Sequence, residues 1–128
     1  VMLEKPGPAI KDLDAILAQN PQNQGIVIAV LYARASYLNM NGGHKKAIED
    51  AEAILKLDPE HAGAFQARGT AYLGMKKYKE SETDLTKAIS LNPRDHVNYT
   101  VRAAVYEAQG MAAQAQADKL KAEQLQGQ

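Results

Sequence analysis

AGAFQARGTAYLGMKKYKESETDLTKAISLNPRD, residues 62–95, is one copy of a unit that recurs along this chain. It has an apolar segment on each side of a central turn, and Asn92-Pro93 stops the second segment. The positions of Pro59 and Pro93 differ by 34 (93 − 59 = 34). The same spacing separates two sets of identical residues, which are Arg34, Arg68 and Arg102, and Asp50, Asp84 and Asp118. A fixed period of about 34 residues predicts an array of stacked helix pairs.

Within this copy a large residue, a small residue and an aromatic residue are followed by a Leu, an Ala and a Pro. These residues are Phe65, Gly69, Tyr72, Leu85, Ala88 and Pro93. In this pattern the chain resembles the tetratricopeptide repeat family, although Arg68 stands where that family has Leu and Ser81 where it has its middle Ala. The resemblance implies an all-α fold, a right-handed superhelical solenoid of antiparallel helix hairpins with a concave inner face.

The neighbouring copies follow the same pattern less fully. The first copy has Leu31, Ala35, Leu38, Ala47, Ala51, Ile54 and Pro59, and the third has Tyr99, Ala103, Tyr106, Ala115 and Ala122. In the third copy, Lys119 stands where an aromatic residue is usual and Gly127 where Pro is usual. We therefore expect one repeat domain over residues 1–128. Its predicted parts are a half-repeat or N-terminal cap at 9–21 and repeats at 24–59, 62–93 and 96–127.

Residues 9–19 predict the second helix of a repeat whose first helix is missing. This segment aligns without gaps with residues 47–57, and Asn20-Pro21 ends it as Asp58-Pro59 ends the later copy. Either the array was cut here, or the half-repeat is a cap. The positions of Pro21 and Pro59 differ by 38 (59 − 21 = 38), four more than the period. About one extra helical turn would absorb four residues, and we expect it within 24–30, where it lengthens either the next helix or the loop that leads into it. The further helices are expected at 25–41, 44–57, 61–74, 77–91, 95–109 and 112–125.

The composition limits the classes of partner. The chain has 15 basic and 15 acidic residues, so no net field favours nucleic acid or an anionic membrane. It has no Cys, so thiol and disulfide chemistry are excluded. No apolar run approaches the roughly 20 residues that cross a bilayer, and no signal peptide is apparent. We expect neither a nucleic-acid nor a membrane partner, and the localisation stays unassigned.

Three pairs of charged residues keep the repeat spacing, and one constant offset separates each Arg from its Asp (50 − 34 = 16; 84 − 68 = 16; 118 − 102 = 16). The offset places the two residues of each pair on opposite helices of one hairpin. The pairs are Arg34 with Asp50, Arg68 with Asp84, and Arg102 with Asp118. We interpret them as structural pairs between helices rather than as an anion-binding ladder. Asp12 holds the equivalent place in the half-repeat, but its own Arg is absent.

No pattern in the sequence predicts catalysis. His44, His61 and His96 fall in different turns without a second His or Cys at ligand spacing, so we expect no metal. Gly42-Gly43 lacks the Lys-Ser/Thr of a phosphate loop, and no acidic pair stands apart from the repeat pattern. We expect no enzyme and no cofactor.

The resemblance to tetratricopeptide repeats implies a binding groove lined by the first helix of each hairpin. Repeat alignment assigns to it Tyr32, Ser36, Asn39, Gln66, Thr70, Leu73, Thr100, Val101, Ala104 and Glu107. A subgroup of the family grips the C-terminal carboxylate of Hsp70 or Hsp90 with a clamp of two Lys, two Asn and one Arg. The clamp places hold Tyr32, Ser36, Ala67, Val97 and Val101 here, so no Hsp70/Hsp90 carboxylate clamp is expected.

The sequence thus predicts a non-catalytic protein-interaction module that binds a peptide or protein segment in its concave groove. The groove carries one formal charge, on Glu107, so a neutral or mildly apolar ligand is expected. Side-chain amides and hydroxyls would serve the backbone of that ligand. One alternative is self-association, with the array as a scaffold segment of a longer repeat protein. Another is an accessory lobe of a larger enzyme.

Overall fold

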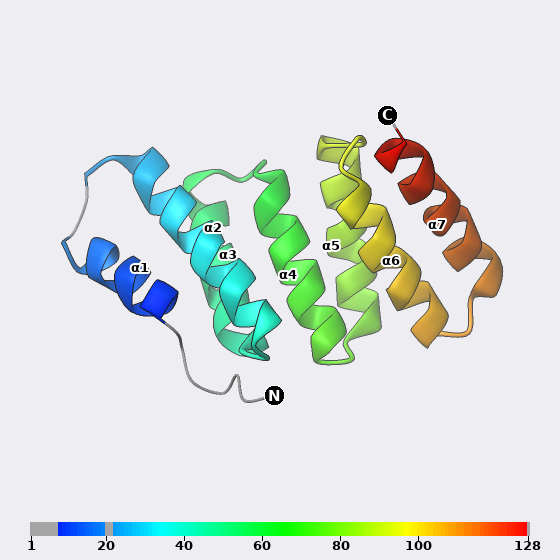
Figure 1. Cartoon of the computed structure of the whole chain (residues 1–128), viewed down its shortest axis with the longest axis horizontal. Coiled ribbons are helices and arrows are strands. Elements are labelled where there is room, and N and C mark those ends of the chain that lie inside the picture. The colour runs from blue at the N-terminus through cyan, green and yellow to red at the C-terminus, as the bar shows by residue number, and fades with distance from the viewer. Residues whose placement is uncertain (1–7, 20–21, 128) are drawn as a thin grey trace.

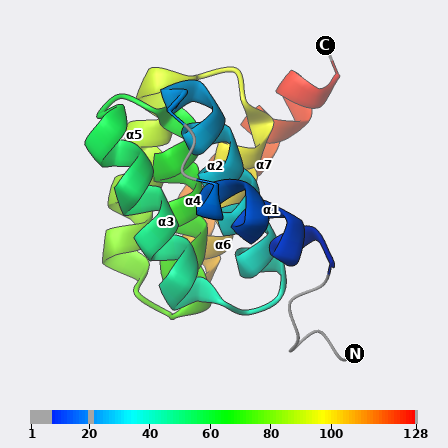
Figure 2. The same ribbon diagram turned by 90° about the vertical axis from the view of Figure 1, so that its left-hand side faces the viewer.

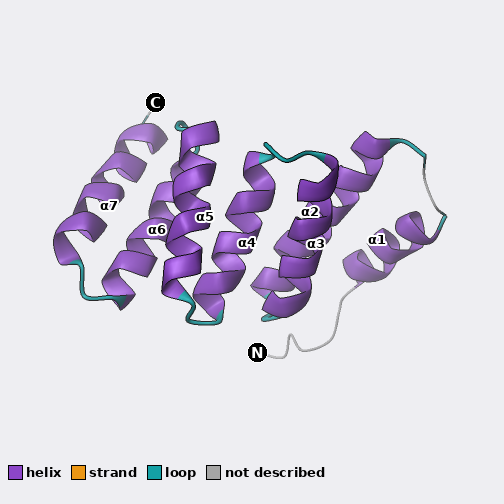
Figure 3. Cartoon of the chain, turned by 180° about the vertical axis from the view of Figure 1, so that it is seen from behind, coloured by secondary structure: helices purple, strands orange, loops and turns teal. Residues whose placement is uncertain are grey.

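The computed structural model describes residues 8–19 and 22–127, and every regular element in that part is an α-helix. The all-α prediction is therefore confirmed for the described residues (Figures 1 and 3). The helices are α1 (Pro8–Ala18), α2 (Gln24–Met40), α3 (His44–Leu57), α4 (Ala62–Gly74), α5 (Tyr78–Leu91), α6 (His96–Ala108) and α7 (Ala112–Gln126).

The helices form an array in which each one packs only on its near neighbours. Antiparallel hairpins are formed by α2 with α3, α4 with α5, and α6 with α7, and each hairpin packs on the one before it. The helices α2, α4 and α6 also contact one another in sequence, and α1 packs on α2 (Figures 1 and 2). This arrangement is a helical repeat solenoid, in which the core runs along the array.

The extra turn lies at the start of α2. This helix has 17 residues, whereas α4 and α6 have 13 each. The last residues of the three helices are one repeat period apart (74 − 40 = 34; 108 − 74 = 34), so the additional residues begin at Gln24, inside the predicted range. The side chain of Asn23 accepts a hydrogen bond from the amide of Ile26 and so caps the lengthened helix.

The turn inside each hairpin places one residue in the left-handed region. Gly42 and Gly110 have φ of 84° and 76°, which glycine adopts without a steric penalty. Lys76 takes the same place in the middle hairpin with φ of 62°. Gly74 has a different role, because a Cβ atom there would lie 2.2 Å from Nε2 of His44. Its missing side chain leaves room for the imidazole at the start of α3.

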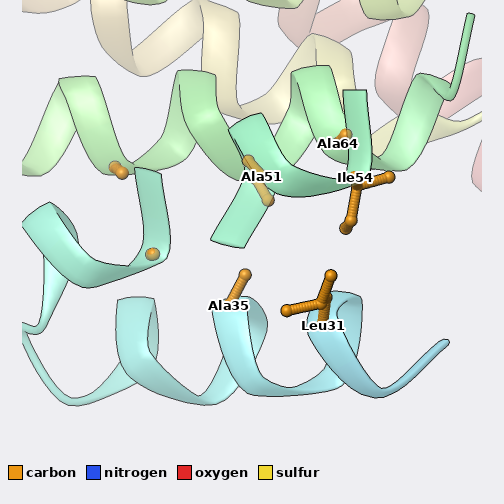
Figure 4. Close-up of a cluster of buried hydrophobic side chains, with 8 residues drawn as sticks. Leu31, Ala35, Ala51, Ile54 and Ala64 are labelled. Atoms are coloured by element: carbon orange, nitrogen blue, oxygen red, sulfur yellow. The ribbon is translucent and has the colours of Figure 1, made fainter. Parts of the chain in front are cut away.

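Small residues let the helices approach closely in the core. One cluster joins Leu31 and Ala35 of α2, Ala51 and Ile54 of α3, and Ala64 of α4 (Figure 4). Only Leu31 and Ile54 are large in this set, so they fill the space between backbones that the alanines bring together. Burial of such a stripe between successive hairpins is what a hairpin alone lacks.

In the next repeat the two facing residues differ strongly in size. A Cβ atom on Gly69 would lie 2.9 Å from Cγ of Leu85, so the large side chain of α5 packs on a backbone without a side chain. The equivalent residues of the first repeat are Ala35 and Ala51, which are both small and both fully buried. The Oγ atom of Ser81 also donates to the carbonyl of Gly69 at 2.7 Å. The second repeat thus places its large side chain on the second helix, opposite a glycine, whereas the first repeat has a small residue on each helix.

Candidate functional site

Each of the three Arg–Asp sets lies in contact across its own hairpin. Nε and Nη2 of Arg34 lie 2.9 and 2.7 Å from the two carboxylate oxygens of Asp50. The same two-bond geometry joins Arg68 to Asp84 at 2.8 and 3.0 Å, and Arg102 to Asp118 at 2.8 and 2.9 Å. The three aspartates are buried, at 5%, 4% and 5% exposed. Hydrogen bonding to the aspartate is the main reason that the pKa of each arginine is raised.

Each arginine also reaches the preceding second helix. Arg34 bonds to Asp14 at 2.8 Å, and Nη1 of Arg68 lies 3.6 Å from Glu52. Arg102 donates to Oγ1 of Thr86 at 3.1 Å. These three partners follow Asp12, Asp50 and Asp84 by two positions, so they are repeat-equivalent, and sequence reasoning missed them. The available signal was an acidic residue at the equivalent position of two copies, Asp14 and Glu52. The third copy has Thr86 there, which is not acidic.

Internal carboxylates therefore occupy much of each guanidinium. A protein that binds an external anion with a row of arginines keeps their N–H donors free. Here Nε and Nη2 of each arginine already donate to an aspartate of the same hairpin. The geometry favours the interpretation of these residues as structural links over the anion-binding ladder. Each link joins the two helices of a hairpin and reaches the hairpin or half-repeat before it.

Four of the predicted groove residues surround one hollow between α2 and α4. The hollow has a volume of about 290 Å³ and is lined by Ser36, Asn39, Met40, Gln66, Ala67 and Thr70. Met40 was not among the predicted residues, yet it is 77% exposed. The available signal was its place at the end of a first helix, where the other copies have Gly74 and Ala108.

The polar side chains of this hollow already have partners inside the protein. Gln66 accepts a hydrogen bond from the hydroxyl of Tyr32 at 3.1 Å, and its amide nitrogen donates to Asp95 and Asn98 at 3.0 and 2.9 Å. Asn39 donates to the carbonyl of Ala67 at 3.0 Å. Both amide atoms of Gln66 therefore bond to residues of or beside the neighbouring first helices, and its contact with a ligand backbone stays a prediction.

A second hollow lies at the other end of the array, between α6 and α7. Its volume is about 370 Å³, and its lining is Thr100, Ala103, Ala104, Glu107, Lys119, Ala122, Glu123 and Gln126. Nζ of Lys119 contacts the carboxylate of Glu107, so the one formal charge predicted for the groove is paired. Leu73 and Val101 are half-buried and line neither of these two hollows.

The described part of the chain has two further properties, which concern metal binding and membrane spanning. No group of three or more His, Asp or Glu residues there is placed to hold a metal ion. None of the described helices is both long and apolar enough to cross a membrane.

Comparison with known proteins places the chain among helical repeats. Residues 62–95 match the model of the tetratricopeptide repeat. The human superkiller complex protein 3 is 35% identical over 60 residues, and the mitochondrial import receptor subunit TOM34 of Rattus norvegicus is 35% identical over 63. These alignments cover 47% and 49% of this chain but only 4% and 20% of the two proteins. The similarity therefore concerns the repeats and not the whole of either relative.

Solved structures show the same fold. A fragment of MamA from Desulfovibrio magneticus RS-1 superposes with a TM-score of 0.76 at 20% identity, covering 91% of this chain and 64% of that one. The second repeat domain of Spaghetti (RPAP3), bound to the HSP90 peptide SRMEEVD, gives a TM-score of 0.71 at 26% identity. That match covers 84% of this chain and 95% of the other.

Proposed function

Because this chain is a tetratricopeptide repeat protein and thus a protein-interaction repeat module, we propose that the face built by α2, α4 and α6 binds a peptide or protein segment without catalysing a reaction. The observation that carries this proposal is the hollow between α2 and α4, with Met40 exposed at its rim. Rigid helices form its walls, so little ordering entropy is lost from the protein on binding. The proposed site is therefore smaller than the groove predicted along all three first helices, and its walls are the residues that line this hollow.

The chemistry of the wall selects a neutral ligand with an apolar side chain. Met40 offers a flexible apolar contact, and Ser36 and Thr70, which carry hydroxyls, line the same hollow. Gln66 and Asn39 are held by internal hydrogen bonds, so they shape the wall rather than receive the ligand. We expect an affinity in the micromolar range, on the order of 8 kcal/mol, because the site is shallow.

We further propose that the ligand is not an acidic C-terminal peptide. The repeat domain of RPAP3 was solved with the HSP90 peptide SRMEEVD, whose last four residues are Glu-Glu-Val-Asp. In this chain the clamp places hold Tyr32, Ser36, Ala67, Val97 and Val101, none of which carries a positive charge. The arginines of the array are engaged with internal carboxylates. A peptide carboxylate would therefore lose water without gaining a cation.

The test uses two probes on the purified chain. Fluorescently labelled SRMEEVD should show no binding by anisotropy, and a displayed library of random short peptides should yield neutral sequences with an apolar anchor. The selected peptides should lose affinity for Thr70→Arg, which fills the hollow, and keep it for Thr83→Arg, which alters an exposed position of α5. Tight binding of SRMEEVD, or equal binding of the selected peptides by both variants, would refute the proposal.

Self-association remains the alternative for this fold. Apolar residues exposed near α1, among them Ile16 and Ile26, are the observation that favours it. Light scattering over a range of protein concentrations separates the two functions. A stable oligomer whose formation blocks the selected peptides would support the scaffold function instead.

A further inference from the structure

Two residues of α1 are exposed although their repeat equivalents are buried. Asp12 and Ile16 hold the places that Asp50 and Ile54 hold in α3 (50 − 12 = 38; 54 − 16 = 38). Asp50 is 5% exposed and Ile54 is fully buried. Ile16 is 38% exposed, and Asp12 is also exposed. The same residue types at the same repeat positions thus have opposite environments.

A third residue, on α2, shows the same contrast. Ala33 precedes Ala67 by one repeat (67 − 33 = 34), and Ala67 is 5% exposed because α2 covers it. Ala33 is exposed. We call the surface formed by Asp12, Ile16 and Ala33 the N-terminal edge. This edge spans α1 and α2. One helix can cover both, because each first helix inside the array that has a hairpin after it contacts the second helix of its own hairpin and also the next first helix.

The contrast arises because α1 has a first helix, α2, packed on one of its sides only, whereas α3 lies between the first helices α2 and α4. Ile54 lies in the cluster between Leu31 of α2 and Ala64 of α4, so it has a first helix on each side (Figure 4). The contact of Asp14 with Arg34 repeats the contact of Glu52 with Arg68, which shows that α1 keeps the register of a second helix. Among the described helices, α1 packs on α2 alone.

We propose that the N-terminal edge binds one amphipathic helix with the chemistry of a first helix. Its Arg would make two hydrogen bonds to Asp12, and its small apolar residues would cover Ile16 and Ala33. The charge follows from the array, where all three equivalent aspartates accept two hydrogen bonds from an Arg on the covering helix. Asp12 is exposed, so a partner can reach its carboxylate from solvent.

The experiment supplies such a helix from this chain's own sequence. In an extended variant, a copy of residues 58–77 replaces residues 1–5 and directly precedes Pro6. The copied Arg68 then has the same offset from Asp12 that each Arg of the array has from its Asp (10 + 6 = 16). Covalent attachment matters because a free helix of this length is only marginally stable in water. We expect the thermal midpoint to rise by several degrees and amide exchange in α1 to slow at least tenfold.

A double-mutant cycle ties the gain to the predicted contact. Asp12→Ala should leave the parent chain nearly unchanged but remove much of the gain in the extended variant, and copied Arg68→Ala should do the same without adding to it. Lys11→Ala, at an exposed neighbouring position, is the matched control. The free peptide of residues 58–77, added to the parent chain at millimolar concentration, gives an independent test, because it should slow exchange in α1 only when Asp12 is present.

Two outcomes overturn the proposal. An extended variant with unchanged exchange in α1, together with no effect of the free peptide, means that no first helix docks here. Alternatively, the parent chain forms a dimer by light scattering that Ile16→Lys converts to a monomer. In that case a second copy of this chain covers the edge, and the separate helix is excluded.

Discussion

Arg34 and Asp14 form an ion pair at 2.8 Å that joins the second described helix to the first. The side chain of Asp14 is 52% exposed, so water screens this contact, whereas the same guanidinium holds the buried Asp50. The buried pair recurs in all three hairpins, whereas the exposed ion pair recurs between Arg68 and Glu52 and is replaced by a hydrogen bond from Arg102 to Thr86 in the third. The exposed link fixes how successive units stack, and the buried pair fixes each hairpin, so their removal should have different consequences.

We expect Arg68→Ala and Asp84→Ala each to lower the free energy of unfolding by about 2–3 kcal/mol. Removal of one partner leaves the other half-buried or buried without its two hydrogen bonds. The double variant should lose much less than the sum, which urea unfolding measures as a coupling energy. Strictly additive losses would contradict the pairing and revive the anion-binding ladder.

By contrast, Asp14→Ala should cost only about 0.2–1 kcal/mol, as for other exposed ion pairs. Its effect should be local, because α1 packs on α2 alone among the described helices. Hydrogen exchange should therefore quicken in α1 and stay unchanged in α6. High salt should reduce the difference between parent and variant. An equal loss of protection along the whole array would mean that α1 is not a separate stabilising unit.

Gly69→Ala should destabilise the chain by about 1 kcal/mol in spite of alanine's higher helix propensity. The added methyl would approach Cγ of Leu85 at 2.9 Å, so the core must shift to admit it. In the presence of Leu85→Ala, the same change should become neutral or stabilising, as in the first repeat, where Ala35 and Ala51 coexist. Equal effects in both backgrounds, measured by urea unfolding, would contradict the proposed division of volume.

Deletion of residues 1–20 should expose apolar surface that α1 now covers on α2. Val30 and Leu31 are each 6% exposed, and Leu17 packs against the cluster that contains Leu31. Bared aliphatic surface of this kind promotes association. We therefore expect the truncated chain to aggregate or associate in light scattering. A monomeric truncated chain with unchanged stability would show that α1 does not act as a cap.

A pH prediction follows from Tyr106, whose pKa is raised mainly by burial. The buried phenol resists ionisation, so its stabilising contribution is complete below pH 10, the ordinary pKa of the unfolded side chain. That contribution should be lost as the pH rises above 10 through the raised pKa of the folded state. Unfolding midpoints of the parent should therefore fall more steeply from pH 9 to 11 than those of Tyr106→Phe. Parallel curves would contradict the burial of an ionisable phenol.

The repeat period was sufficient to predict the helices, because spacing alone places Arg34, Arg68 and Arg102 on equivalent turns. The spacing of the prolines also predicted about one additional turn within 24–30, in the helix or in the loop before it, and the structure has it in the helix, at the start of α2. The period could not predict which polar groups bind each other across repeats. Gln66 reaches Tyr32 one repeat earlier and Asn98 one first helix later, and these contacts depend on rotamers and on the spacing of three helices.

Because of the hydrogen bonds of Gln66, a substitution of this residue should change stability as well as ligand binding. Gln66→Ala leaves the buried Asn98, which is 1% exposed, without one of its partners, so it should lower stability by about 1–2 kcal/mol besides any effect on binding.

Met40→Ala touches no such network and should lower the affinity of a library-selected peptide roughly tenfold while the unfolding midpoint stays constant. Met75→Ala, at the exposed end of the next first helix, is the matched control and should bind like the parent. Since none of the residues that line the hollow between α2 and α4 carries a formal charge, raising the ionic strength should change the affinity by less than twofold. A steep loss with salt, or full binding by Met40→Ala, would move the site away from the hollow between α2 and α4.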